Sequence, residues 1–301
     1  MTEPRTLTLT SLPSLLPLMA RGALLSPFKR PRPGLTAPGT RLVLPGLRIA
    51  QSHLAAYERV CAFPTGRAEL PITYPHILGF PLAMRLMSER AFPLPLLGLV
   101  HTSIDITQER DLAPGDTYEL AVRVEELRAH RRGTEAVVST GLRTGGVLVW
   151  QSTSTYLARH KTAGVAESVP AATESGAPLP PLADWTLRGD LGRRYAAASG
   201  DRNPIHLHPL TARLFGFPRA IAHGMWTVAR CLAHHGASGP VHVHARFKAP
   251  VLLPGTVTYA AQGSSFELRN PKGDRVHVTG EVRKPGGGNQ DVAEVRELGR
   301  D

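Results

Sequence analysis

The chain has 301 residues, of which 42% are hydrophobic, and carries a formal net charge of +11 at pH 7. That length and apolar content can build one large domain or two ordinary ones, and they exclude a chain that is disordered throughout. The positive charge favours an anionic partner. Because the basic residues are scattered and lack aromatic interleaving, we expect solvated surface rather than nucleic-acid binding. Coenzyme A or an acidic carrier protein would suit the charge equally well.

Residues 12–25 resemble an export signal only superficially. Pro13 and Pro17 interrupt the apolar run, no basic stretch precedes it, and no window reaches the roughly 18 apolar residues of a membrane span. The two cysteines, Cys61 and Cys231, match no disulfide or metal spacing, which favours a reducing compartment. We therefore predict a cytoplasmic protein without membrane insertion.

Three stretches rich in Pro, Gly and small polar residues divide the chain. They predict an N-terminal extension (1–40), a first domain (41–160), a linker (161–184), a second domain (185–283) and a flexible tail (284–301). The two domains repeat each other in layout, and such a repeat constrains the architecture more firmly than any single element.

In chain order, the first half is predicted to contain two helices and then strands. The helices cover residues 52–62 and 77–87, and the strands cover 117–125, 135–143 and 147–156. A Pro-Gly-Asp turn precedes the first of these strands, and the pair Gly145-Gly146 joins the last two as a hairpin.

The second half follows the same plan. Helices are predicted over residues 191–199 and 225–234, and strands over 241–248, 256–262, 265–269 and 275–283. Pro254-Gly255 stands before a strand as Pro114-Gly115 does in the first half. Each half is therefore predicted as helix, helix and antiparallel sheet, an α+β fold.

Between the two helices of the second half lies the run YAAASGDRNPIH, residues 195–206, followed by AHGM at 222–225. It places an acid (Asp201), an imidazole (His206) and a backbone amide at a helix start (Gly224) close together in sequence. Proline and glycine in the run predict a turn, with Asp201 and His206 at a loop edge. Taken singly, these residues could be a turn cap, a core histidine and a helix-initial glycine. Ser199 lacks a Gly-x-Ser-x-Gly elbow and is expected only to shape the turn.

A long apolar helix followed by a meander of strands suggests a sheet curled around a helix. Residues 185–283 resemble the MaoC-like dehydratases, which include the (R)-specific enoyl-CoA hydratases, in the two motifs above and in RFKAPV at 246–251. The first half resembles the degenerate partner domain of double hot-dog members, especially actinobacterial 3-hydroxyacyl-thioester dehydratases. The resemblance implies a double hot-dog, in which two antiparallel sheets each wrap a central helix.

The resemblance also implies an activity, the reversible (R)-specific hydration of 2-enoyl thioesters of coenzyme A or acyl carrier protein in fatty-acid or related lipid metabolism. By position in the motif, Asp201 and His206 would share the acid and base work on one water, Gly224 would bind the thioester oxygen, and Asn203 would orient the pair. No cofactor is implied. Leu232 stands where some small hydratases carry a serine, which could alter rate or substrate range.

Weaker expectations concern the rest of the substrate. Arg202, Arg219 and Lys248 are candidates for phosphate contacts, although plain surface charge would explain each equally well. The first half lacks Asp and His in the corresponding run 61–67, so we expect one active site per chain. Its apolar helix would then widen an acyl tunnel, with the side chains of Phe80, Leu82 and Leu86.

Several alternatives remain open at this stage. The chain could be a hot-dog thioesterase that releases free thiol, or a noncatalytic module that binds acyl carriers. Closely spaced histidines, such as His206 with His208 and His242 with His244, lack a Cys or carboxylate partner at a useful spacing, so no metal is expected. Two hot-dog halves in one chain allow a monomer, or a homodimer through the outer sheet.

Overall fold

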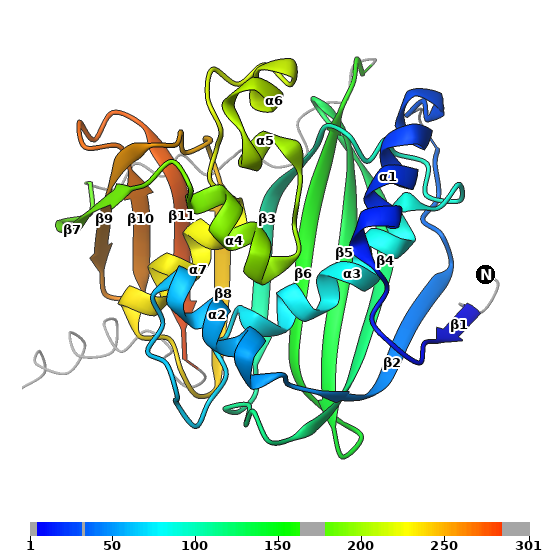
Figure 1. Cartoon of the computed structure of the whole chain (residues 1–301), viewed down its shortest axis with the longest axis horizontal. Helices are drawn as coiled ribbons and strands as arrows, with labels where there is room; N and C mark the ends of the chain where they lie inside the picture. Colours follow the sequence, from blue (N-terminus) through cyan, green and yellow to red (C-terminus); the bar gives the residue numbers. More distant parts are fainter. Residues whose placement is uncertain (1–4, 32–33, 163–177, 285–301) are drawn as a thin grey trace, which may run out of the picture.

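The computed structural model describes residues 5–31, 34–162 and 178–284. They form an eleven-stranded sheet in the order β1-β2-β4-β5-β6-β3-β8-β11-β10-β9-β7, with the helices gathered on one face (Figure 1). The first half consists of β1 (Arg5–Thr8), α1 (Leu15–Leu25), a 3-10 turn (Ser26–Phe28), β2 (Thr40–Arg48), α2 (Gln51–Cys61), α3 (Tyr74–Ser88), β3 (Leu99–Gln108), β4 (Thr117–His130), β5 (Gly133–Thr144) and β6 (Val147–Arg159). The second half consists of β7 (Pro181–Leu187), α4 (Leu191–Ser199), α5 (Pro204–Leu207), α6 (Pro209–Leu214), α7 (Gly224–His235), β8 (Val241–Phe247), β9 (Gly255–Gln262), β10 (Ser265–Arg269) and β11 (Val276–Arg283).

The two halves share one strand order. The first runs β2-β4-β5-β6-β3 and the second β7-β9-β10-β11-β8, so each uses its strands in the order first, third, fourth, fifth, second. The second strands meet at the middle, where β3 and β8 pair antiparallel with Ile104 opposite Ala245. The predicted repeat and the double hot-dog fold are confirmed, and the two predicted sheets join edge to edge into one.

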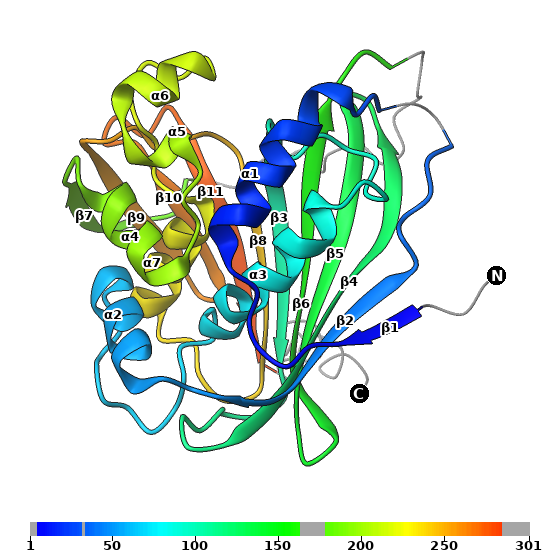
Figure 2. The same ribbon diagram turned by 45° about the vertical axis from the view of Figure 1, so that its right-hand side comes forward.

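The central helices occupy the concave side of each half. In α3 every side chain except Phe80 and Arg85 is buried, as expected for a helix that is apolar around its whole circumference. The central helix α7 is tied to the other half, because the Trp226 indole N–H donates to the Val60 carbonyl of α2 at 2.8 Å. The view in Figure 2 shows the sheet curling behind α3 and α7. Among the described residues, no helix combines the length and apolar character needed to cross a membrane.

Some predicted boundaries were wrong. Strand β2 precedes α2 and strand β7 precedes α4, and both were missed, as was β3. The strand β7 lies at a sheet edge, and only its residues Trp185 and Leu187 are buried. It begins at Pro181, inside the predicted linker 161–184. The predicted extension supplies β1, which pairs parallel with β2, and α1. Residues 163–177 and 285–301 of the predicted linker and tail lie outside the described residues.

Candidate active site

The turn after α4 holds the Asp201 carboxylate in a defined place. Helix α4 ends at Ser199, and Gly200 takes a left-handed conformation (φ 77°) that glycine adopts without strain. The Asp201 N–H then donates to the Ser199 hydroxyl at 3.2 Å, and the Asp201 carboxylate accepts from the Asn203 N–H at 3.1 Å. Ser199 thus shapes the turn as predicted, and the backbone orients the acid.

Asn203 caps the short helix that carries the imidazole. Its side-chain oxygen accepts from the Ile205 N–H at 3.4 Å, and Pro204 occupies the first helical position, where its missing N–H costs nothing. His206 therefore lies within the one-turn helix α5 and not at a loop edge as the sequence suggested. The prediction assumed that proline would only break structure, whereas here it restarts a helix.

His206 is fixed as one tautomer. Its Nδ1–H donates to the Ile221 carbonyl at 2.8 Å, so Nε2 keeps the lone pair. Burial lowers the pKa of His206, and the nearby Asp201 charge, which raises it, only partly offsets that effect. The imidazole is therefore neutral near pH 7 and can accept a proton at Nε2.

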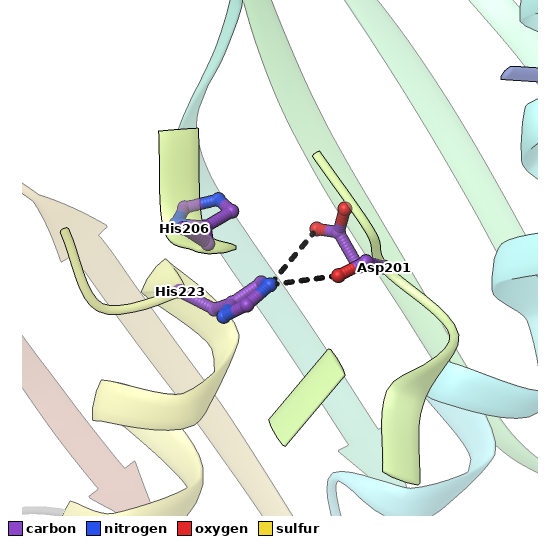
Figure 3. A group of neighbouring side chains, drawn as sticks. All are labelled: Asp201, His206 and His223. Atoms are coloured by element: carbon purple, nitrogen blue, oxygen red, sulfur yellow. Dashed lines mark hydrogen bonds and ion pairs between the residues drawn. The ribbon is translucent and has the colours of Figure 1, made fainter. Parts of the chain in front are cut away.

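A second imidazole, His223, completes the group, and the sequence analysis assigned it no role. Its Nε2–H donates to the Asp201 backbone carbonyl at 2.9 Å, and its ring stacks on His206 with centroids 3.7 Å apart (Figure 3). Burial, and next the neighbouring His206, hold the pKa of His223 well below its usual value. The available signal was its place directly before the helix-initial glycine.

Asp201, His206 and His223 also satisfy the distances of a metal site, since one ligand atom from each lies within 4.8 Å of the others. The hydrogen bonds argue for acid and base chemistry instead. A metal at His223 Nε2 would require that nitrogen to lose its proton and would leave the Asp201 carbonyl unpaired. Of the closely spaced histidines named in the sequence analysis, only His206 belongs to this group. His208 caps α6, and His244 forms a hydrogen bond with Asp105 at 2.7 Å.

Gly224 begins α7 beside this group. The first N–H groups of a helix have no intrahelical acceptor and lie at the positive end of its dipole, so the Gly224 N–H is suited to bind an oxyanion. A Cβ added here would lie 2.9 Å from the ring of Phe247 on β8. A larger residue at this position would therefore force the Phe247 ring to move.

A further glycine, Gly192 of α4, was not identified from the sequence. A Cβ at this position would lie 1.9 Å from the His206 carbonyl oxygen, so α4 and α5 pack backbone to backbone. The same helix brings Tyr195 against the ring of His223, with centroids 4.8 Å apart. The position of both imidazoles thus depends on α4.

The other predicted substrate residues lie partly on the surface and partly beside α3. Arg202, Arg219 and Lys248 are exposed, and Arg219 donates to the Pro254 carbonyl at 3.0 Å. In the first half, Phe80 lines a small cavity beside α3. Leu82 and Leu86 are fully buried and are not among the residues that line it.

The first half repeats the geometry of the turn without its chemistry. Helix α2 ends in left-handed Ala62 (φ 58°), as α4 ends in Gly200, but residues 63–66 that follow provide neither a carboxylate nor an imidazole. Pro75, which has no N–H, stands in the first turn of α3. Both observations support one active site per chain.

The repeated halves define a double hot-dog protein, and the part-buried Asp201 with the buried His206, beside a helix-initial amide, gives it an acid and base pair. The family described as MaoC like domain matches residues 172–284. The 3-hydroxyacyl-thioester dehydratase X of Mycobacterium tuberculosis is 38% identical over 252 residues, which cover 82% of this chain and 90% of that protein. The chain belongs to the MaoC-like dehydratase family.

Solved structures agree with this assignment. A crystal structure of HtdX from Mycobacterium tuberculosis matches with a TM-score of 0.71 and 36% identity, covering 81% of this chain and 99% of that one. A MaoC-like dehydratase from Phytophthora capsici matches with a TM-score of 0.65 at 17% identity, over 85% of this chain and 98% of that one. The second likeness supports the fold alone.

Buried neutral histidines predict a loss of stability in acid. The pKa of His76 falls from 6.5 to about 4 through burial, so between these values only the unfolded chain takes up the proton. The stability from this residue is complete above pH 6.5 and decreases by about 1.4 kcal/mol per pH unit below it, about 3 kcal/mol by pH 4. The pKa values of His101, His206 and His223 are shifted in the same direction and add to the loss.

Urea unfolding at a series of pH values measures this dependence. The slope of the unfolding free energy against pH counts the protons taken up on unfolding. We expect His76→Leu to reduce this slope below pH 6.5 by about one proton, since His76 binds a proton there only in the unfolded chain. A free energy of unfolding that stays flat from pH 6.5 down to 4 would contradict the burial of these neutral rings.

Proposed function

We propose that the chain catalyses the reversible, (R)-specific hydration of 2-enoyl thioesters and the dehydration of (R)-3-hydroxyacyl thioesters. The observation that carries the proposal is the pair formed by the Asp201 carboxylate and the His206 ring, which have ligand atoms within 4.8 Å of each other, close enough for one water to bind both. The family assignment and the relative named as a 3-hydroxyacyl-thioester dehydratase support it.

In the hydration direction, the water is activated by loss of a proton to one member of the pair. Its hydroxyl adds to the β carbon, and the α carbon takes up a proton, so that water is added across the double bond. Because a single water lies between both groups, hydrogen and hydroxyl arrive on the same face. Asp201 and His206 share the proton work; the His206 tautomer makes Nε2 the acceptor available at neutral pH.

The negative charge that develops on the thioester oxygen needs a donor already in place. The Gly224 N–H, at the start of α7, fits that role, and one such donor contributes about 3 kcal/mol to stabilising a transition state. The hydrogen bond from His223 to the Asp201 carbonyl holds the acid turn against α7. It thereby sets the distance between the water and the bound thioester.

A spectrophotometric assay with 2-enoyl-CoA substrates tests the proposal. Hydration removes the absorbance of the conjugated enoyl thioester without releasing thiol, and we expect this result with the (R)-3-hydroxyacyl product. A thiol reagent run in parallel detects the rival activity, a hot-dog thioesterase. Thiol release at the rate of substrate loss, with no hydroxyacyl product, would overturn the proposal. No turnover of any kind would favour a noncatalytic acyl-binding module.

We further propose that the acyl group is delivered on coenzyme A or acyl carrier protein in fatty-acid or related lipid metabolism. The net charge of +11 supports an anionic carrier of either kind. Two free, buried cysteines support a reducing, cytoplasmic setting. Because β3 and β8 already join two hot-dog halves, we expect a monomer, or a homodimer through the outer sheet, which light scattering would distinguish.

Gly192→Ala should impair hydration without touching a reacting group. The added Cβ would lie 1.9 Å from the His206 carbonyl oxygen, so α5 must move away from α4. We expect kcat to fall about 10- to 100-fold, because small displacements of a catalytic group have effects of that size, and the free energy of unfolding to fall by about 1 to 3 kcal/mol.

Gly115→Ala is the matched control for this variant. A Cβ at Gly115 meets no atom within 4 Å, so wild-type kcat and stability are expected. If Gly192→Ala also kept wild-type kcat, the packing of α4 against α5 would not be what positions His206.

A further inference from the structure

The solvent-facing sides of two helices, α1 and α6, carry large apolar side chains. Of the eleven large hydrophobic side chains that are exposed among the described residues, seven lie on these helices or within three residues of them: Leu12, Leu16, Leu24, Phe28, Leu210, Leu214 and Phe215. Leu24, Phe28 and Leu214 are 73%, 82% and 83% exposed. A surface helix normally turns polar side chains to solvent, so this concentration indicates a contact surface.

Both helices lie beside the turn that carries Asp201. The inward side of α1 packs on this turn, because a Cβ at Gly200 would collide with the Leu15 side chain. Helix α6 begins at Pro209, three residues after His206. Two views place α6 and the C-terminal end of α1 at the same end of the molecule (Figures 1 and 2). A single partner at that end could therefore contact both helices next to the catalytic pair.

The net positive charge of the chain comes from the stretches of sequence that contain these two helices. Residues 4–57 contain seven Lys or Arg and no Asp or Glu, and residues 202–266 contain six and none. The rest of the chain holds 22 basic and 24 acidic residues, so the two stretches account for the whole net charge of +11. The basic residues closest in sequence to the exposed apolar ones are Arg21, Lys29, Arg30, Arg213 and Arg219. Such a surface suits an acidic partner that also presents apolar side chains.

An open hollow where α1 ends combines the two properties. It is lined by Leu25, Phe28, Lys29 and Arg90. The Lys29 ammonium is held in place, because it donates to the Met87 and Glu89 carbonyls at 3.2 and 2.9 Å. A fixed cation beside an exposed aromatic ring can receive a carboxylate together with an apolar side chain of the same partner.

The chemistry of the surface distinguishes between possible partners. A second copy of the chain would bring the same basic residues against each other, which like-charge repulsion disfavours. Coenzyme A would satisfy the charge but has no apolar body to cover leucines on two helices. An anionic lipid surface has both properties but has no need to lie beside the catalytic turn. A protein that delivers the substrate must dock there, since its thioester has to reach Asp201 and His206.

We propose that α1 and α6 form the docking surface for an acidic acyl carrier protein, which presents its enoyl thioester to Asp201 and His206. The basic residues attract and orient the carrier, and the exposed leucine and phenylalanine side chains form the apolar centre of the contact. The inference rests on the proposed function and names the carrier of its substrate.

The test measures hydration of one 2-enoyl group carried either on a bacterial acyl carrier protein or on coenzyme A. We expect wild-type kcat/KM to be higher with the carrier protein and to fall as salt is raised, because charge steers the encounter. Leu24→Ser combined with Phe28→Ser should lower kcat/KM with the carrier protein by about tenfold or more, the effect of losing an apolar contact at an interface centre. The same variant should hydrate the enoyl-CoA at the wild-type rate.

Val147→Ser combined with Leu182→Ser is the matched control. These side chains are 64% and 57% exposed, lie at the start of β6 and in β7, and belong to neither basic stretch. Wild-type kcat/KM is expected with both substrates. If Leu24→Ser with Phe28→Ser left the carrier-protein value unchanged, the inference would be overturned. An equal loss with both substrates would also overturn it, because these side chains would then act on the acyl group or coenzyme A.

Binding separates this inference from the proposed function. The phosphopantetheine form of the carrier protein, without an acyl group, should bind wild type and bind Leu24→Ser with Phe28→Ser about tenfold more weakly, as fluorescence anisotropy would show. Sedimentation with phosphatidylglycerol vesicles runs in parallel. Binding to these vesicles without binding to the carrier protein would overturn the inference in favour of a lipid surface. If wild type hydrated nothing, the proposed function would fail while the affinity for the carrier protein still decided the docking.

Discussion

Asp201→Asn is expected to lower kcat for enoyl-thioester hydration by about a thousandfold, within the range that general acid and base groups contribute. The side chain keeps its size, and its amide oxygen can still accept from the Asn203 N–H, a bond now 3.1 Å long. What is lost is the carboxylate, whose negative charge binds the water and which exchanges a proton with it. The Michaelis constant should change little, because the Gly224 amide remains.

Asp190→Asn is the control for this charge change. Asp190 stands at the other end of α4 and pairs on the surface with Arg188 at 3.2 Å, so its loss should leave kcat at the wild-type value. Melting temperatures of both variants show whether the fold is kept. A kcat for Asp201→Asn within tenfold of wild type would remove this residue from the chemistry.

His206→Asn is expected to have an effect of similar size. The asparagine amide N–H can replace Nδ1–H as donor to the Ile221 carbonyl, now at 2.8 Å, but nothing replaces Nε2. The fold should therefore survive while the second proton-transfer group disappears. Combining it with Asp201→Asn should give a variant about as slow as the slower single one, because both groups act on the same water.

His208→Asn gives a closely matched control two residues further on. His208 is exposed and its Nδ1 accepts from the Leu210 N–H at 3.2 Å, a capping bond that an asparagine oxygen can also accept. Wild-type kcat is expected. If the double variant instead lost the product of the two single effects, Asp201 and His206 would be acting on separate steps.

Much of the architecture could be predicted because it depends on local pattern. Helices over α2, α3, α4 and α7 and strands over β4 to β6 and β8 to β11 follow from apolar periodicity and from glycine or proline turns. The edge strand β7 could not be found this way, because most of its residues are not buried and its partner β9 follows about 70 residues later. The one-turn helix α5 was missed since proline both ends and begins helices.

For the site, the sequence alone determined the residue types and their order: an acid, an amide, an imidazole and a helix-initial glycine, in one half only. This was possible because the groups lie close together in sequence. The glycine, asparagine and proline of the run form a turn that keeps them close in space, independently of the rest of the fold. Only the tertiary structure decided the tautomer of His206, the stacking of His223 and the backbone contact of Gly192. Each depends on atoms from different elements meeting, and burial then sets the pKa and pairing of groups that local sequence leaves undetermined.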